Sequence, residues 1–147
     1  MITKFLLLAL FGIAMAHLEG VTVVYLRKVF GIDDLQSNRD LLKKIPKQYI
    51  FIEKTREVAT IIMLVTIALL VGKTWLDMIV VFLWTFAFWD LFYYLSLYIL
   101  TKWPPSLKTI DVLFLIPRPW IAPVWFPIGI SSITIITIAI LLLTSVL

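Results

Sequence analysis

The sequence predicts an all-α integral membrane protein, built as a four-transmembrane-helix bundle in one domain over residues 1–147. Hydrophobic residues make up 62% of the chain and its mean hydropathy is +1.04, whereas soluble domains contain about 45–50% apolar residues. Four apolar segments are each long enough to cross a bilayer, which takes roughly 20 helical residues. Helices are expected because an open sheet edge finds no hydrogen-bond partner in lipid.

The first expected span, at about 5–26, has a rival interpretation as a cleaved signal peptide. A short apolar core followed by two small residues, Ala14 and Ala16, fits a cleavage site. Cleavage there would leave His17 at the amino terminus, where it could chelate copper. The apolar run resumes after Glu19, however, and ends at two basic residues. This continuation favours an uncleaved span.

The remaining spans are expected at about 49–71, 75–100 and 122–147. The third is rich in aromatic residues, and a tight turn joins it to the second. Between the third and fourth lies Leu107–Ile116, which is bounded by prolines and too short to cross the bilayer. We expect this segment to be interfacial or re-entrant and to pack over the bundle.

The distribution of Lys and Arg predicts the orientation of the chain. Residues 27–56 carry eight of them and residues 101–120 carry three, against two on the opposite side. Cytoplasmic loops are enriched in Lys and Arg. The connections at 27–48 and 101–121 are therefore expected in the cytoplasm, and both termini on the outer side of the plasma membrane. The expected partners are the lipid bilayer and anionic lipid head groups.

Composition excludes several classes of function. The chain has no cysteine, which rules out disulfides, iron–sulfur clusters and thiol catalysis. Its single histidine cannot supply bis-histidine haem ligation within one chain. Phosphate-binding loops, nucleophile elbows and zinc-protease motifs are also absent from the sequence. The formal charge of +4 comes from basic residues beside the spans, so we expect no nucleic-acid partner.

Ionisable residues in or beside the apolar segments are the candidate functional residues, because a charge in hydrocarbon is costly unless it is paired, hydrated or bound. The orientation gathers them towards the cytoplasmic side. At 1.5 Å per residue, Glu19 lies roughly 10 Å and Asp90 roughly 15 Å inside their spans. The set consists of Glu19, Glu53, Arg56, Glu57, Asp90 and Asp111.

We expect a ligand-binding cavity formed by Glu19, Arg56, Glu57, Asp90, Tyr93 and Tyr94. Arg56 is the candidate counter-ion of Glu53, Glu57 or Asp90, and its planar fork could also bind an anion bidentately. The tyrosines are candidate hydrogen-bond donors. Glu53 and Asp111 also have structural interpretations, as part of a hydrated helix entrance and as a cap.

Three kinds of function are compatible with such a cavity. A divalent cation is one possibility, with candidate oxygen and nitrogen ligands from His17, Glu19, Glu57, Asp90 and Asp111. Acid or base catalysis on a lipid is another, with Glu57 and Asp90 as candidates. In a third interpretation the chain is a structural subunit, either of a homo-oligomer or of a larger membrane complex in which these charges pair with a partner.

Five stretches of the chain together resemble an uncharacterised family of small prokaryotic four-helix membrane proteins. These stretches are Val24–Arg27, Arg56–Thr60, Trp89–Tyr94, Trp103–Leu107 and Asp111–Trp120. The resemblance covers most of the chain and implies the four-helix fold. It implies no known activity.

Overall fold

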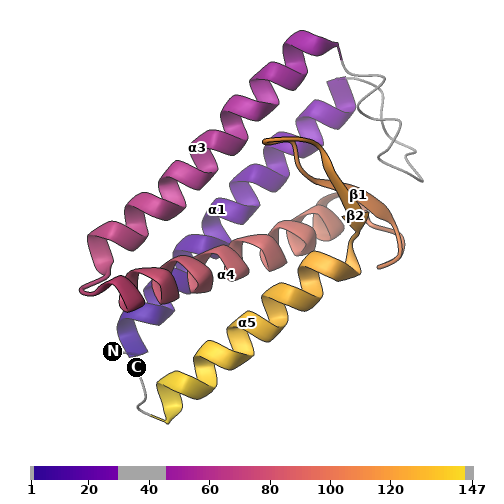
Figure 1. Cartoon of the computed structure of the whole chain (residues 1–147). Coiled ribbons are helices and arrows are strands. Elements are labelled where there is room, and N and C mark those ends of the chain that lie inside the picture. Colours follow the sequence, from indigo (N-terminus) through magenta and orange to yellow (C-terminus); the bar gives the residue numbers. More distant parts are fainter. Residues whose placement is uncertain (1, 30–45, 145–147) are drawn as a thin grey trace.

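The computed structural model describes residues 2–29 and 46–144, and within these residues the protein is mainly helical (Figure 1). The elements follow in the order α1 (Ile2–Val29), α3 (Lys47–Val71), α4 (Trp75–Thr101), β1 (Ile110–Phe114), β2 (Trp120–Pro123) and α5 (Trp125–Leu143). The four helices overlap the four ranges expected from the sequence. Most of the connection expected at 27–48 lies outside the described residues.

Three helices of the described chain are long and apolar enough to cross a membrane, namely α1, α4 and α5. The protein is therefore a membrane protein by length and composition of its helices. Helix α3 has 25 residues, but every 18-residue stretch of it includes Lys54, Arg56 and Glu57. Its first half is too charged to meet the same criterion.

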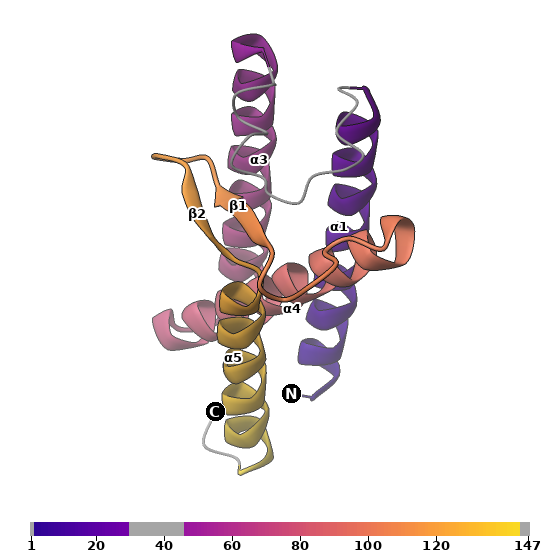
Figure 2. The same cartoon turned by 90° about the vertical axis from the view of Figure 1, so that its right-hand side faces the viewer.

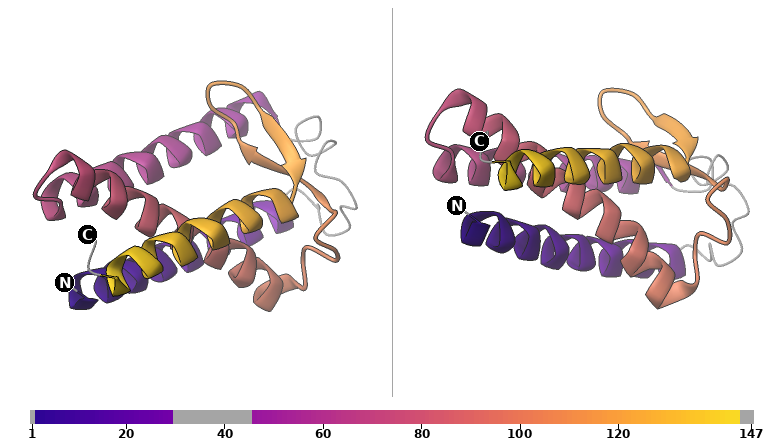
Figure 3. Two further views of the ribbon diagram at one scale, coloured as in Figure 1. Left: turned by 60° about the horizontal axis from the view of Figure 1, so that its bottom comes forward. Right: turned by 90° about the horizontal axis from the view of Figure 1, so that it is seen from below.

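Helix α4 lies at the centre of the molecule and packs against α1, α3 and α5. Figures 2 and 3 show that it crosses these three helices obliquely, whereas they run roughly alongside one another. Successive helices run in opposite directions, so the start of α1 and the end of α5 lie at one end of the molecule (Figure 1). At that end the core is apolar and includes Phe5, Val81 and Trp84.

Small residues bring α1 unusually close to α4. Gly12, Ala16 and Gly20 recur every four residues along the buried face of α1. A Cβ atom added at Gly12 would lie 2.9 Å from the backbone oxygen of Thr85, and one at Gly20 would lie 3.0 Å from Cβ of Ser96. Stripes of small residues favour close backbone packing between helices in lipid. This stripe holds α1 against the central helix.

Helix α3 buries only a narrow stripe. Its buried residues are Glu53, Thr60, Leu64 and Ala68, which recur at helical spacing. Apolar side chains on its other faces are exposed, and Leu70, for example, is 77% exposed. A helix of this kind has little apolar contact with its neighbours, so polar contacts contribute much of what fixes its position.

The prediction of an all-α fold is wrong for the segment between α4 and α5. Strands β1 and β2 form an antiparallel hairpin in which Asp111 pairs with Ala122 and Val112 with Ile121. Prolines lack the N–H group that a helix requires, and the segment carries several of them at 104–123. Backbone bonds from Val124 to Thr109 and from Trp125 to Leu107 continue the pairing into the start of α5.

Candidate functional site

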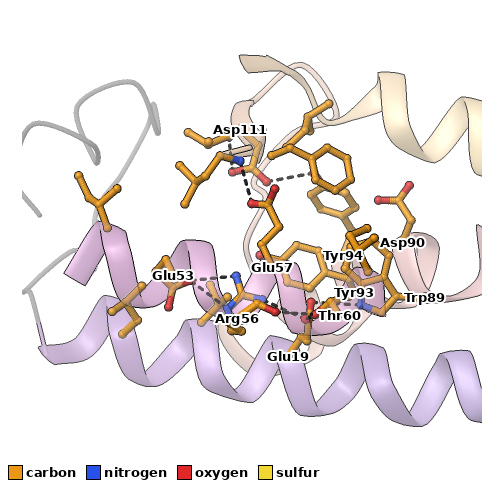
Figure 4. A pocket seen from close by; sticks show the side chains of 18 of the residues that line it. Glu19, Glu53, Arg56, Glu57, Thr60, Trp89, Asp90, Tyr93, Tyr94 and Asp111 are labelled. Atoms are coloured by element: carbon orange, nitrogen blue, oxygen red, sulfur yellow. Dashed lines mark hydrogen bonds and ion pairs between the residues drawn. The ribbon is translucent and has the colours of Figure 1, made fainter. Parts of the chain in front are cut away.

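A cavity of about 120 Å³ lies at the end of the bundle where α1 ends and α3 begins (Figure 4). Helices α1, α3 and α4 and strand β1 form its walls. Eight polar or charged residues named from the sequence line it, namely Glu19, Glu53, Arg56, Glu57, Asp90, Tyr93, Tyr94 and Asp111. The cavity is roomy enough for several water molecules or a small ligand.

Arg56 joins α1 to α3 through two carboxylates. Its Nη2 lies 2.8 Å from Oε2 of Glu53, one turn away on the same helix, and its Nε donates to that oxygen at 3.0 Å. Its Nη1 lies 3.1 Å from Oε1 of Glu19 on α1. All three guanidinium nitrogens therefore contact carboxylates, which leaves the fork little capacity to bind an anion.

Glu19 is buried and receives polar contacts from two further side chains. The Thr60 hydroxyl on α3 donates to Oε1, and the Trp89 indole on α4 donates to Oε2 at 3.1 Å. With Arg56, these contacts connect one carboxylate to both neighbouring helices. Because buried charges require such partners, Glu19 is fixed at the point where three helices meet.

Glu57 ties the hairpin to α3. The backbone N–H of Leu115 donates to Oε2 at 2.8 Å, and that of Ile116 donates to Oε1 at 3.1 Å. These residues directly follow β1, so the carboxylate contacts the loop of the hairpin. Of the three acids named from the sequence as candidate partners of Arg56, it pairs with Glu53 and not with Glu57 or Asp90, and its second partner is Glu19.

The two remaining acids of the cavity accept hydrogen bonds from hydroxyl groups. Ser131 on α5 donates to Oδ2 of Asp90 at 2.7 Å. Tyr94 donates to Oδ2 of Asp111 at 3.0 Å, and Oδ1 of Asp111 accepts from the backbone N–H of Val112 at 2.8 Å. Tyr94, one of the two tyrosines expected to be hydrogen-bond donors, thus donates to a residue of the hairpin. The sequence did not point to Ser131, because helical phase relates residues of one helix and Ser131 lies on α5 whereas Asp90 lies on α4.

Aromatic rings form part of the cavity lining. Trp89 and Tyr93 stack with centroids 6.4 Å apart, and Tyr93 meets Tyr94 edge-on at 5.3 Å. Among the described residues no hydrogen bond is made by the Tyr93 hydroxyl, whereas that of Tyr94 is used. Phe114 of β1 lies in the same lining. The lining therefore includes several aromatic rings and, in Tyr93, a hydroxyl group that makes no hydrogen bond within the described residues.

Arg27 is the second cation of the lining and packs on an aromatic ring. Its guanidinium carbon lies 3.9 Å from the ring centroid of Trp103. Its buried Nε has no hydrogen-bond partner within the described chain. Five carboxylates against two guanidinium groups give the lining a formal charge of −3.

His17 is the one candidate ligand that lies outside the cavity lining. It is exposed on α1, where its Nδ1 lies 3.3 Å from Oγ of Ser96. Within residues 2–29 and 46–144, no three His, Asp or Glu side chains are placed to hold a metal ion together. The carboxylates line the same cavity but do not converge on one point.

Comparisons of the chain with models of known protein families, with curated proteins and with solved structures found no match.

Proposed function

We propose that this is a multi-pass membrane protein that binds a small ligand, lipid head group or cation in the cavity between α1, α3, α4 and β1. In this proposal all four helices cross the plasma membrane, both termini face outward, and the cavity lies in the cytoplasmic half. The residues proposed to form the binding site are Glu19, Arg56, Glu57, Asp90, Tyr93 and Tyr94, of which Arg56 holds the helices in position.

One observation carries the proposal: residues from three helices and a hairpin, far apart in sequence, line a single cavity with an excess of carboxylates. A structural role alone requires each carboxylate to find a partner, and would be served best by a filled interior. A cavity of about 120 Å³ beside these groups leaves room for a further molecule.

The topology is supported by the position of basic residues relative to the cavity. Arg27 and Lys28 end α1, and Lys102 and Lys108 follow α4 at the same end. The opposite end carries Lys4, which pairs with Asp77 at 2.6 Å. Under the positive-inside rule the cavity end faces the cytoplasm.

The contacts of Arg56 favour a positioning role over the anion binding that the sequence also allowed. Its contacts with Glu19 and Glu53 make it a positioning residue that holds α3 beside α1. An anionic cargo at Arg56 would have to displace one of these carboxylates. Arg27, the other cation in the described lining, packs on the ring of Trp103, and the five carboxylates of the lining exceed the two guanidinium groups. We therefore favour cationic or hydrogen-bonding ligands over anionic ones. Catalysis by Glu57 or Asp90 and a structural role in a larger complex have no comparable support.

Native mass spectrometry of the purified full-length protein, combined with metal analysis, tests the proposal. We expect a bound small molecule, lipid or cation that is lost from the Asp90→Asn variant. Asn keeps the oxygen that accepts from Ser131 but removes the charge. Asp77→Asn is the matched control because Asp77 lies outside the cavity lining. This variant should retain the ligand. Equal occupancy in both variants, or none in the wild type, would contradict the proposal.

A further inference from the structure

The kind of cation that fits this cavity follows from which of its acids have charged partners. This step rests on the proposed function, since it assumes that the cavity binds a ligand. The single positive charge of Arg56 is shared by Glu19 and Glu53. Asp90 accepts only from a neutral hydroxyl and Glu57 only from backbone amides, within the described chain. A positive charge in the cavity would be attracted by both.

The spread of these acids disfavours a divalent metal ion. Mg²⁺ and Ca²⁺ need several oxygen ligands within about 2–2.6 Å of one point. The described acids form no group of three that meets this requirement. Each is also held by hydrogen bonds on a different element, which fixes the separation. The field is therefore negative but diffuse.

Aromatic faces suit a cation whose charge is spread over carbon. Trp89, Tyr93 and Tyr94 line the same cavity as the acids, as Figure 4 shows. An ammonium group is attracted to the face of such rings, and ammonium ligands are commonly bound between aromatic side chains. Apolar side chains such as Val23 and Ile61 complete the walls and would contact carbon atoms of the ligand.

From these features we propose that the cavity binds a small organic ammonium ion. Asp90 and Glu57 supply the negative charge, and Trp89, Tyr93 and Tyr94 supply the aromatic walls. The hydroxyl of Tyr93 is the donor for a polar group next to the ammonium centre. The same ammonium chemistry occurs in free amines and in the head groups of amine-containing phospholipids, and the cavity recognises what they share.

Binding of radiolabelled choline to the full-length wild-type protein in detergent is the direct test. We expect unlabelled choline and tetramethylammonium to displace it. We expect no displacement by 3,3-dimethyl-1-butanol, the neutral carbon analogue of choline, nor by Mn²⁺ or inorganic phosphate. Displacement by the neutral analogue as readily as by choline would show that the cavity does not distinguish a charged ligand from a neutral one. Displacement by Mn²⁺ alone would identify a metal site. Both results overturn the inference.

Variants of one aromatic residue test the walls without changing charge. Tyr93→Phe keeps the ring and Tyr93→Leu removes it, so choline affinity should fall about 2- to 30-fold more in the second, the range expected for a cation–π contact. Tyr98→Phe and Tyr98→Leu are the matched controls, since Tyr98 is 50% exposed and lies outside the cavity lining. Equal affinities of the two Tyr93 variants for choline would exclude a contact with the ring.

Two further measurements separate this inference from the proposed function. Asp90→Asn should weaken choline binding at least about tenfold, as loss of a buried charge partner does, while Asp77→Asn should not. If native mass spectrometry finds a ligand that depends on Asp90 but contains no ammonium group, the proposed function stands and this inference fails. Nanodiscs with and without phosphatidylethanolamine assign the source. Weaker choline binding in its presence indicates a lipid head group, and unchanged binding a soluble amine.

Discussion

Glu19 shows how one residue can fix the arrangement of three helices. It lies on α1, pairs with Arg56 and accepts from Thr60 on α3, and accepts from Trp89 on α4. The alternative, an unpaired carboxylate at this depth, would be costly in a membrane. Glu19 is thus held in place by the same contacts that hold α3 next to α1.

Replacing Glu19 with Gln should destabilise the protein by about 1–3 kcal/mol, because the amide keeps an acceptor oxygen but loses the ion pair with Arg56. Unfolding by denaturant in detergent micelles, followed by tryptophan fluorescence, measures the change. Glu53→Gln is the control. Its pair with Arg56 is within one helix, so this substitution leaves the Glu19–Arg56 contact between α1 and α3 in place, and we expect a smaller loss. A larger effect at Glu53 than at Glu19 would contradict this account.

The carboxylates of the cavity could be named from the sequence because the cost of burying charge singles them out. Their partners could not, because a sequence pattern gives the phase within one helix and says nothing of the rotation of its neighbours. Arg56 was expected to serve Glu53, Glu57 or Asp90, and it pairs with Glu53 and Glu19. Whether these residues bind a ligand stays a prediction.

At the scale of elements, the stripe of small residues on α1 makes a separate prediction. Gly12→Ala places a Cβ atom 2.9 Å from the backbone oxygen of Thr85, so α1 must shift away from α4. We expect a loss of about 1–3 kcal/mol in the free energy of unfolding, as is common for overpacking. Thermal unfolding in detergent reports it.

Gly129→Ala is the matched control for this helix contact. A Cβ atom at Gly129 meets nothing within 4 Å, and Gly129 also lies in a helix, α5. Alanine is favoured over glycine in a helix interior by roughly 0.5–1 kcal/mol, so this variant should be neutral or slightly more stable. A similar loss in both variants would mean that the close approach of α1 to α4 has no special role.

The contact between Glu57 and the hairpin predicts a local change in mobility. Glu57→Ala removes the acceptor for the N–H groups of Leu115 and Ile116, so their amide hydrogens should exchange faster with solvent. Hydrogen–deuterium exchange on peptides covering 110–123 measures this. Glu53→Ala removes a carboxylate from the same helix and should leave the hairpin unchanged. Equal exchange in both variants would show that Glu57 does not hold the hairpin.

The helices were predictable and the hairpin was not, for a physical reason. A run of about 20 apolar residues has one stable form in lipid. The short apolar segment before Pro117 is compatible with either a strand or a helical turn, and its partner strand begins only after Pro117 and Pro119. The close packing at Gly12 and Gly20 was also missed, although their spacing with Ala16 was visible in the sequence.

For the molecule as a whole, the proposed topology can be tested with single cysteines because the chain has none of its own. A cysteine at Lys73 should react with a membrane-impermeant maleimide in intact cells, and one at Lys43 or Lys108 should not. All three should react once the membrane is opened with detergent. Ready labelling of Lys43→Cys or Lys108→Cys from outside would show that the orientation is the opposite of the proposed one and that the cavity faces the outer side.

The ion pair between Glu19 and Arg56 also bears on the order of membrane insertion. The first half of α3 carries several charges, so insertion of α3 into the bilayer on its own would be unfavourable. Helix α1 is synthesised before α3 and is apolar enough to enter the bilayer by itself. Its Glu19 can then pair with Arg56 of α3. In the proposed four-span topology, we therefore expect α3 to insert together with α1 as a pair of helices. Glu19, which contacts α3 and α4 in the folded protein, would then also help α3 to enter the membrane during synthesis.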